Sequence, residues 1–173
     1  FKRLRKPLLG IGALFQAGST SGDIHFKEYE AAARALKMEL QSLGVRGQTP
    51  DFEAAFQTAA RGRVNALVTI TNSLTTFYRK EIAALAVKHR MPSMFEGSQS
   101  VETGGLMSYS ADEAESFRRA AVYVDKILKG AKPQDLPVEQ PIRFELVINL
   151  KTAKQIGLTI PQSVLYRADR VIK

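Results

Sequence analysis

Short runs of apolar residues alternate with amphipathic segments along most of this chain. The apolar runs lie at 8–15, 66–70, 92–95, 106–109 and 143–150. Runs of this length bounded by Gly, Pro or polar residues are typical of strands buried on both faces of a sheet. Between them, apolar positions recur with helical spacing and predict helices over 23–43, 50–59, 74–89 and 111–130.

Strands that alternate with helices favour parallel pairing and right-handed crossovers. We therefore predict an α/β fold with a three-layer, doubly wound and mostly parallel sheet. The regularity changes after Phe95, where 96–105 is predicted to be a loop and the proline-rich stretch 130–141 an extended connector. A short helix ending at Gly157 and a last helix over 161–171 complete the prediction.

Composition narrows the classes of function. The 173 residues are 45% apolar and suffice for one domain, and the absence of cysteine excludes disulfides and thiolate metal sites. The net charge of +8 includes a basic leading segment, 1–7, but the other charges are dispersed among acidic residues, so we expect no nucleic-acid partner. No apolar run reaches the roughly 18 residues of a membrane span. We expect any export signal to lie upstream of this numbering.

Residues suited to catalysis are scarce. The two histidines, His25 and His89, are predicted to lie at helix ends on the surface, without the partners that a nucleophile or zinc site needs. The glycines of 10–12 lie inside a predicted strand, whereas a dinucleotide fingerprint places them after it. Gln16 and Asn72 stand where a receiver-like domain would need acidic residues. We predict no catalytic residue, metal ligand or cofactor.

The loops that follow the strands are the candidate binding positions, because ligands of open α/β sheets bind at the carboxyl ends of the strands. These loops are 16–21, 71–73, 96–98 and 108–110, and they carry amides, hydroxyls and one carboxylate. Ser19 and its neighbours are predicted either to bind a carboxylate or only to cap the next helix. Tyr109 is predicted either to stack on an aromatic ligand or to belong to the core.

Several separated motifs, in the same order, resemble the C-terminal part of the solute-binding proteins of ABC importers, in the branch that includes binders of aromatic amino acids. The motifs are 102–110, 122–136, 144–161 and 167–172. The resemblance implies a periplasmic-binding-protein type I fold, in which two α/β lobes are joined by a hinge and close on a solute. Residues 8–173 would form the C-terminal lobe, without the amino-terminal lobe and export signal of a complete member. Residues 111–141 would be a crossover helix and connector that pack on the other lobe.

By this resemblance the chain is a periplasmic or otherwise extracytoplasmic component of an ABC importer, with permease subunits in the membrane as partners. Its solute would be an amino acid or a small aromatic or branched carboxylate. The ligand-binding residues on this side of the cleft would be Gln16, Ala17, Gly18, Ser19, Asn72, Ser73, Glu96 and Tyr109.

Two other functions stay open, namely a ligand-sensing regulatory domain of the same fold and a small doubly wound enzyme. The helix over 111–130 carries an apolar stripe that includes Phe117 and Leu128. A large apolar stripe is rarely left in water. We therefore predict that a homodimer covers this helix or that the helix folds back on its own sheet.

Overall fold

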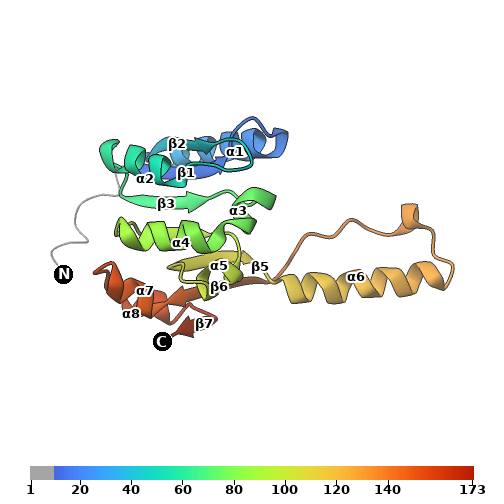
Figure 1. Cartoon of the computed structure of the whole chain (residues 1–173). Helices are drawn as coiled ribbons and strands as arrows, with labels where there is room; N and C mark the ends of the chain where they lie inside the picture. Colours follow the sequence, from blue (N-terminus) through green and yellow to red (C-terminus); the bar gives the residue numbers. More distant parts are fainter. Residues whose placement is uncertain (1–9) are drawn as a thin grey trace.

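A seven-stranded sheet forms the centre of residues 10–173, the part of the chain that the computed structural model describes (Figure 1). The strands are β1 Gly10–Gln16, β2 Glu39–Val45, β3 Ala66–Thr69, β4 Ser93–Phe95, β5 Met107–Ala111, β6 Phe144–Asn149 and β7 Arg170–Ile172. Their order across the sheet is β2-β1-β3-β4-β5-β6-β7, and all neighbours are parallel except β5 and β6. The predicted fold class is confirmed. The leading segment 1–7 lies outside the described residues, as do the first two positions of the predicted strand 8–15.

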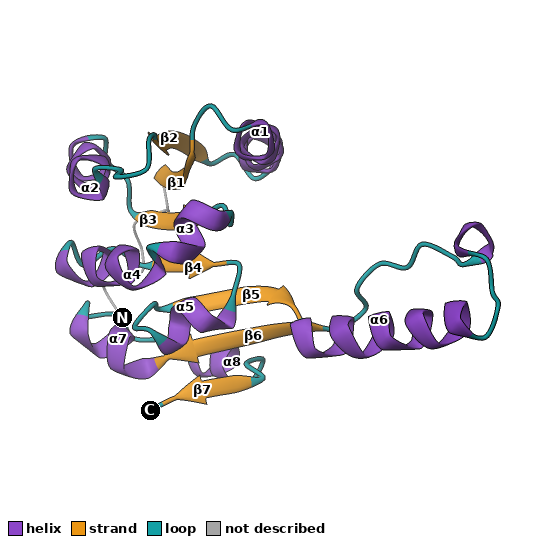
Figure 2. Ribbon diagram, turned by 45° about the vertical axis from the view of Figure 1, so that its right-hand side comes forward, coloured by secondary structure: helices purple, strands orange, loops and turns teal. Residues whose placement is uncertain are grey.

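Helices cover both faces of the sheet, and Figure 2 shows α2, α4 and α7 on one side of it and α1 on the other. The helices are α1 Thr20–Ala35, α2 Phe52–Arg61, α3 Ser73–Phe77, α4 Arg79–Lys88, α5 Ser98–Glu102, α6 Glu113–Leu128, α7 Leu150–Gln155 and α8 Gln162–Leu165, with a 3-10 turn, η1, at Pro133–Asp135. Among these helices none combines the length and apolarity required to cross a bilayer.

The largest part of the core lies between α2, α4 and the central strands. Phe52 and Phe56 of α2 are each 1% exposed and pack in one cluster with Leu14 of β1. A Cβ atom added to Gly12 would lie 2.5 Å from Leu43 Cδ1. The glycine in β1 therefore permits close packing against the neighbouring strand, which accounts for it without a nucleotide.

The edge strand β2 corrects the prediction of one helix over 23–43. Helix α1 ends at Ala35, and Lys37 then turns the chain with a left-handed φ of 56°. Leu40 and Leu43 continue the helical spacing of apolar residues in the sequence, but they lie in β2. Because an asparagine or glycine usually marks such a turn, a lysine in this position gave no sign of the helix end.

Three other boundaries differ from the prediction. The helix over 74–89 is two helices, α3 and α4, which meet at Tyr78. The predicted loop 96–105 contains the short helix α5. The last helix ends at Leu165 and is followed by β7 at the sheet edge, where a single helix through 171 was predicted.

Helix α6 and the connector after it project away from the sheet as an arm, residues 112–143 (Figures 1 and 2). The two ends of the arm are adjacent, because Ala111 of β5 pairs with Phe144 of β6. No residue of α6 is buried, and the predicted stripe is exposed, at 74% for Phe117 and 82% for Leu128. The alternative in which the helix folds back on its own sheet is therefore wrong, and the homodimer stays a prediction.

The connector runs back along α6 and is held to it by polar contacts. Tyr123 donates a hydrogen bond from its hydroxyl to the carbonyl of Pro137 at 2.6 Å, and Arg119 pairs with Glu139. The arm is thus a small helix and strap unit with its own internal contacts.

Candidate functional site

Three of the four predicted loops after strands lie together at one edge of the sheet, the edge formed by the carboxyl ends of β1, β3 and β4. The strands β1, β3 and β4 are adjacent and parallel, so their carboxyl ends point the same way. The loop after β1 carries residues 16–19, the loop after β3 carries Asn72 and Ser73, and Glu96 follows β4 directly. Seven of the eight predicted binding residues therefore share this edge.

The loop after β1 is a tight turn that also caps α1. The Ser19 hydroxyl accepts a hydrogen bond from the amide of Gly22 at 3.1 Å and donates to the carbonyl of Gln16 at 2.9 Å. Gly18 has a left-handed φ of 82°, and its amide lies 3.3 Å from Asp23 Oδ1. Of the two roles predicted for Ser19, the structure shows the cap.

The side chain of Ala17 does not project into open space. A Cβ atom on Gly44 would lie 2.7 Å from Ala17 Cβ, and the Ala17 amide donates to the carbonyl of Val45 at 2.9 Å. Ala17 therefore ties the end of β1 to β2, and only its backbone carbonyl is left to face a ligand.

The loop after β3 is built around a capping box. Asn72 Oδ1 accepts from the Thr75 amide at 3.0 Å, and Thr75 Oγ1 accepts from the Asn72 amide at 3.0 Å. Asn72 Nδ2 is buried and has no hydrogen-bond partner among the described residues, while Ser73 is exposed. The amide group of Asn72 thus keeps a free donor beside the edge of the sheet.

Glu96 connects three elements at the same edge. Its Oε1 accepts from the hydroxyl of Tyr29 in α1 at 2.7 Å, and its Oε2 accepts from the Thr71 amide after β3 at 2.9 Å. Burial of the hydroxyl, followed by its hydrogen bond to Glu96, raises the pKa of Tyr29. Tyr29 therefore stays protonated at neutral pH and serves as a donor to the carboxylate.

Tyr109 lies within β5 and not in a loop, directly after Ser108, which pairs with Phe95 of β4. It is 55% exposed, and its ring stacks on Phe144 of β6 with 5.5 Å between centroids. The alternative that Tyr109 belongs to the core is therefore wrong. The pair forms an exposed aromatic surface close to the point where the arm leaves the sheet.

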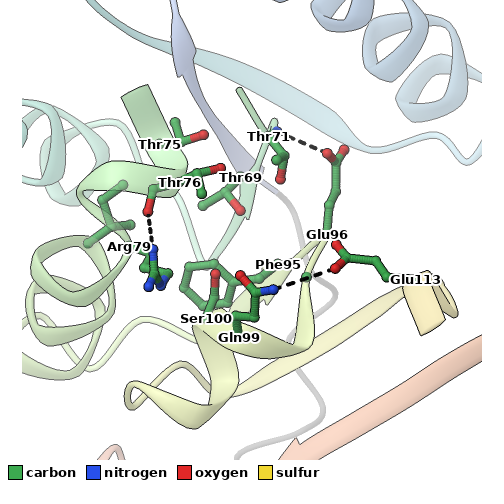
Figure 3. Close-up of a pocket in the computed structure, with 12 residues that line it drawn as sticks. Thr69, Thr71, Thr75, Thr76, Arg79, Phe95, Glu96, Gln99, Ser100 and Glu113 are labelled. Carbon is green, nitrogen blue, oxygen red and sulfur yellow. Dashed lines mark hydrogen bonds between the residues drawn. The ribbon is translucent and has the colours of Figure 1, made fainter. Parts of the chain in front are cut away.

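A hollow with a cavity volume of about 80 Å³, partly open to solvent, lies beyond the ends of β3 and β4 (Figure 3). Its lining includes hydroxyls from four threonines and one serine, the apolar ring of Phe95, the cation of Arg79 and the carboxylates of Glu96 and Glu113. Glu96 is the single predicted binding residue in this lining. Arg79, Glu113 and Tyr29 lie in helices, and no sequence signal marks them as residues that reach the ends of the strands.

The groups at this edge suit binding better than catalysis. No histidine lines the hollow, and within residues 10–173 no cluster of three or more His, Asp or Glu side chains is arranged to hold a metal ion. His89 stacks on Phe56, lies 3.2 Å from Glu53 Oε1 and caps the C-terminal end of α4, whereas Arg79 in the hollow is the first residue of that helix. Hydroxyl and amide donors beside charged groups are the usual means of fixing a small polar molecule.

Comparison with protein families gives one match over nearly the whole chain. The model for ABC transporter substrate binding proteins matches residues 6–172. None of the curated proteins matches significantly.

Solved structures share the fold. The ABC domain from Streptococcus pneumoniae in complex with L-Trp is 26% identical, with a TM-score of 0.77 over 94% of this chain and 56% of that one. A conserved domain protein from Vibrio cholerae is 23% identical, with a TM-score of 0.84 over 98% of this chain and 57% of its own. A ligand-free, open substrate-binding protein with adhesive properties from Clostridium difficile is 17% identical, with a TM-score of 0.72 over 95% and 54%. The chain thus spans little more than half the length of these structures.

Proposed function

The chain belongs to the family of ABC transporter substrate-binding proteins, and we propose that it forms one lobe of a protein that captures a small solute for an ABC importer. The match of the family model to residues 6–172 carries this proposal. The polar edge at the ends of β1, β3 and β4 supports it, because this is where doubly wound sheets bind ligands. In this function the chain binds its solute and leaves it chemically unchanged.

The proposed solute is an amino acid or a small aromatic or branched carboxylate. Support comes from the Streptococcus pneumoniae structure, which holds L-Trp and is similar to 94% of this chain. The residues proposed to face the solute are those predicted from the sequence, namely Gln16, Ala17, Gly18, Ser19, Asn72, Ser73, Glu96 and Tyr109. Asn72 has the clearest case among them, because its Nδ2 donor is buried and unpaired within the described structure.

The arm is proposed to pack on a second lobe, so that residues 8–173 form one lobe and 111–141 the crossover helix and connector. The similar structures are nearly twice as long as the part this chain matches, and the apolar stripe of α6 is exposed in it. A homodimer through the helix 111–130 is the alternative arrangement that covers the same stripe. Light scattering on the purified chain separates the two, because the homodimer has twice the mass of the chain.

The proposed partners and location follow from the importer function. The solute is passed to ABC permease subunits in the membrane, which requires that the protein work outside the cytoplasm, in the periplasm or its equivalent. The net charge of +8 does not conflict with this function, because the family's ligand is a small molecule and the basic residues are spread over the chain.

The solute proposal is tested by nuclear magnetic resonance with the ¹⁵N-labelled chain. L-tryptophan and L-leucine at about 10 mM, enough to detect a Kd near 1 mM, are expected to shift the amide signals of 16–19, 71–73 and 96–98. D-glucose, which has no charge, is the control and should shift none of them. If neither amino acid moves these signals, or if glucose moves them equally, the proposed solute class is wrong.

A further inference from the structure

Arg79 is a cation without an acidic partner in the hollow beyond β3 and β4. Its Nη1 donates to the carbonyl of Thr76 at 2.8 Å, but its Nε is buried and has no hydrogen-bond partner among residues 10–173. Arg118, Arg119 and Arg170 each contact a glutamate, and Arg79 differs from all the described arginines in having a buried donor without a partner. The described structure offers Arg79 no such contact.

The unpaired donor of Arg79 lowers the stability of the protein without a ligand. A buried donor that has lost water and gained no acceptor costs about 1 to 3 kcal/mol, and more when the group is charged. The planar guanidinium presents its N–H groups as a fork that matches the two oxygens of a carboxylate. A ligand carboxylate in the hollow would therefore provide the acceptor that the fold does not.

The opposite side of the hollow carries negative charge, as Figure 3 shows for Glu113, which lies across Phe95 from Arg79. Both oxygens of Glu96 are already engaged, by Tyr29 and by the Thr71 amide. Glu113 is exposed at the start of α6 and its one polar contact in the described structure is with Gln99, at 3.5 Å.

The two free charges therefore have opposite signs and face one hollow. Its cavity volume of about 80 Å³ is enough for the charged groups of an amino acid, so the side chain of the solute would lie outside the hollow. A molecule with a carboxylate at one end and an ammonium group near it would satisfy both sides. An acceptor-only ligand would pair with Arg79 and leave Glu113 without an opposite charge.

We propose that Arg79 binds the carboxylate of the solute in this hollow and that Glu113 faces its ammonium group. The inference rests on the proposed function and deepens it, because it selects free amino acids from the wider class of small carboxylates. It also places the ligand against the first turn of α6, where the arm begins.

If Arg79 had a purely structural role, its replacement would affect stability and not ligand affinity. The contact with the Thr76 carbonyl lies near the end of α3, so the arginine could serve only to fix the α3–α4 junction. In that case Arg79→Met would lower stability and leave ligand affinity unchanged. If the unpaired Nε marks a ligand site, Arg79→Met lowers affinity while the melting temperature of the free protein does not fall below that of the wild type.

The experiment compares three ligands and four variants by calorimetry and by the side-chain Nε–H signal of Arg79. The ligands are L-tryptophan, L-tryptophanamide, which lacks the carboxylate, and indole-3-propionate, which lacks the ammonium group. The variants are Arg79→Met, Arg79→Lys, Glu113→Gln and, as a charge-matched control on the exposed end of α1, Arg34→Gln.

L-tryptophan and indole-3-propionate are expected to shift the Arg79 Nε–H signal, and L-tryptophanamide is not. The Kd for L-tryptophan should rise about tenfold or more in Arg79→Met, less in Arg79→Lys, and not in Arg34→Gln. Glu113→Gln should weaken the binding of L-tryptophan and leave that of indole-3-propionate unchanged.

The outcomes separate this inference from the proposed function. If Arg79→Met binds L-tryptophan like the wild type, the inference is overturned and the amino-acid proposal stands. If indole-3-propionate shifts the Arg79 signal while no amino acid binds, the anion site stands and the amino-acid class is wrong. If no ligand moves the Arg79 signal and calorimetry detects no binding of L-tryptophan, both are wrong.

Discussion

Replacing Tyr29 by phenylalanine tests whether Glu96 is held in place by the contact between α1 and β4. The substitution keeps the ring and removes the hydroxyl that donates to Glu96 Oε1 at 2.7 Å. Hydrogen bonds to charged groups contribute about 1.5 to 3 kcal/mol to stability. Since Tyr29 and Glu96 are only partly buried, the lower end applies and we expect a loss of about 1 to 2 kcal/mol. For a chain of this length that corresponds to a fall of about 3 to 6 °C in the melting temperature.

Urea unfolding followed by circular dichroism measures the loss, and Tyr166→Phe is the matched control because that tyrosine is 81% exposed. A second measurement shows whether the carboxylate has moved. The Thr71 amide donates to the other oxygen of Glu96 at 2.9 Å, so its NMR signal should shift in Tyr29→Phe and not in the control.

Equal unfolding free energies for Tyr29→Phe and the wild type, with an unmoved Thr71 amide signal, would refute the reasoning. The carboxylate would then be held by the β3–β4 loops alone. A loss as large in Tyr166→Phe would show that the loss in Tyr29→Phe does not come from the hydrogen bond between Tyr29 and Glu96.

Three further outcomes follow from burial and charge. Hydrogen bonds from Lys88, and then from His89, lower the pKa of Glu53. Its contribution to stability is therefore present above about pH 4.5 and is lost as the pH falls below that value, so acid unfolding should be less steep in Glu53→Gln. The raised pKa of Tyr29 acts at the other end, with its contribution present below about pH 10 and lost above it, so alkaline unfolding should be less steep in Tyr29→Phe. Phe56 is 1% exposed, so Phe56→Ala should lower the free energy of unfolding in urea by about 3 to 5 kcal/mol. Phe117 is 74% exposed, so Phe117→Ala should change it by less than about 0.5 kcal/mol. Similar losses for Phe56→Ala and Phe117→Ala would mean that α6 is buried in solution.

The sequence predicted the sheet well because most strands are buried runs with clear boundaries. In place of β2 the sequence indicates only a weak extended piece near Val45, because this edge strand has few buried residues and its Leu40 and Leu43 continue the spacing of α1. The turn at Lys37 carries no glycine, and the break at Tyr78 between α3 and α4 carries neither glycine nor proline. Helix ends of this kind depend on tertiary contacts, which a local pattern does not contain.

The candidate site likewise contains residues that the sequence predicted and residues that it did not. Loops after strands are readable from the sequence, so Glu96 and Asn72 were predicted, and the parallel order of β1, β3 and β4 explains why they share an edge. Arg79 and Tyr29 reach that edge from helices. Which face of a helix meets a sheet depends on packing, and therefore no spacing rule would have identified these two residues.

The arm has a consequence for how this family of chains can change during evolution. Its two ends are joined at the base by the hydrogen bond from the Asp112 amide to the Arg143 carbonyl at 3.0 Å, where β5 and β6 run antiparallel. The residues beyond that bond form one long connection between two antiparallel strands. Doubling the length of such a connection lowers the free energy of unfolding by only about 0.6 kcal/mol. Insertions and deletions beyond the first turn of α6 can therefore occur without altering strand order, so that the outer part of the arm and the lobe can diverge at separate rates.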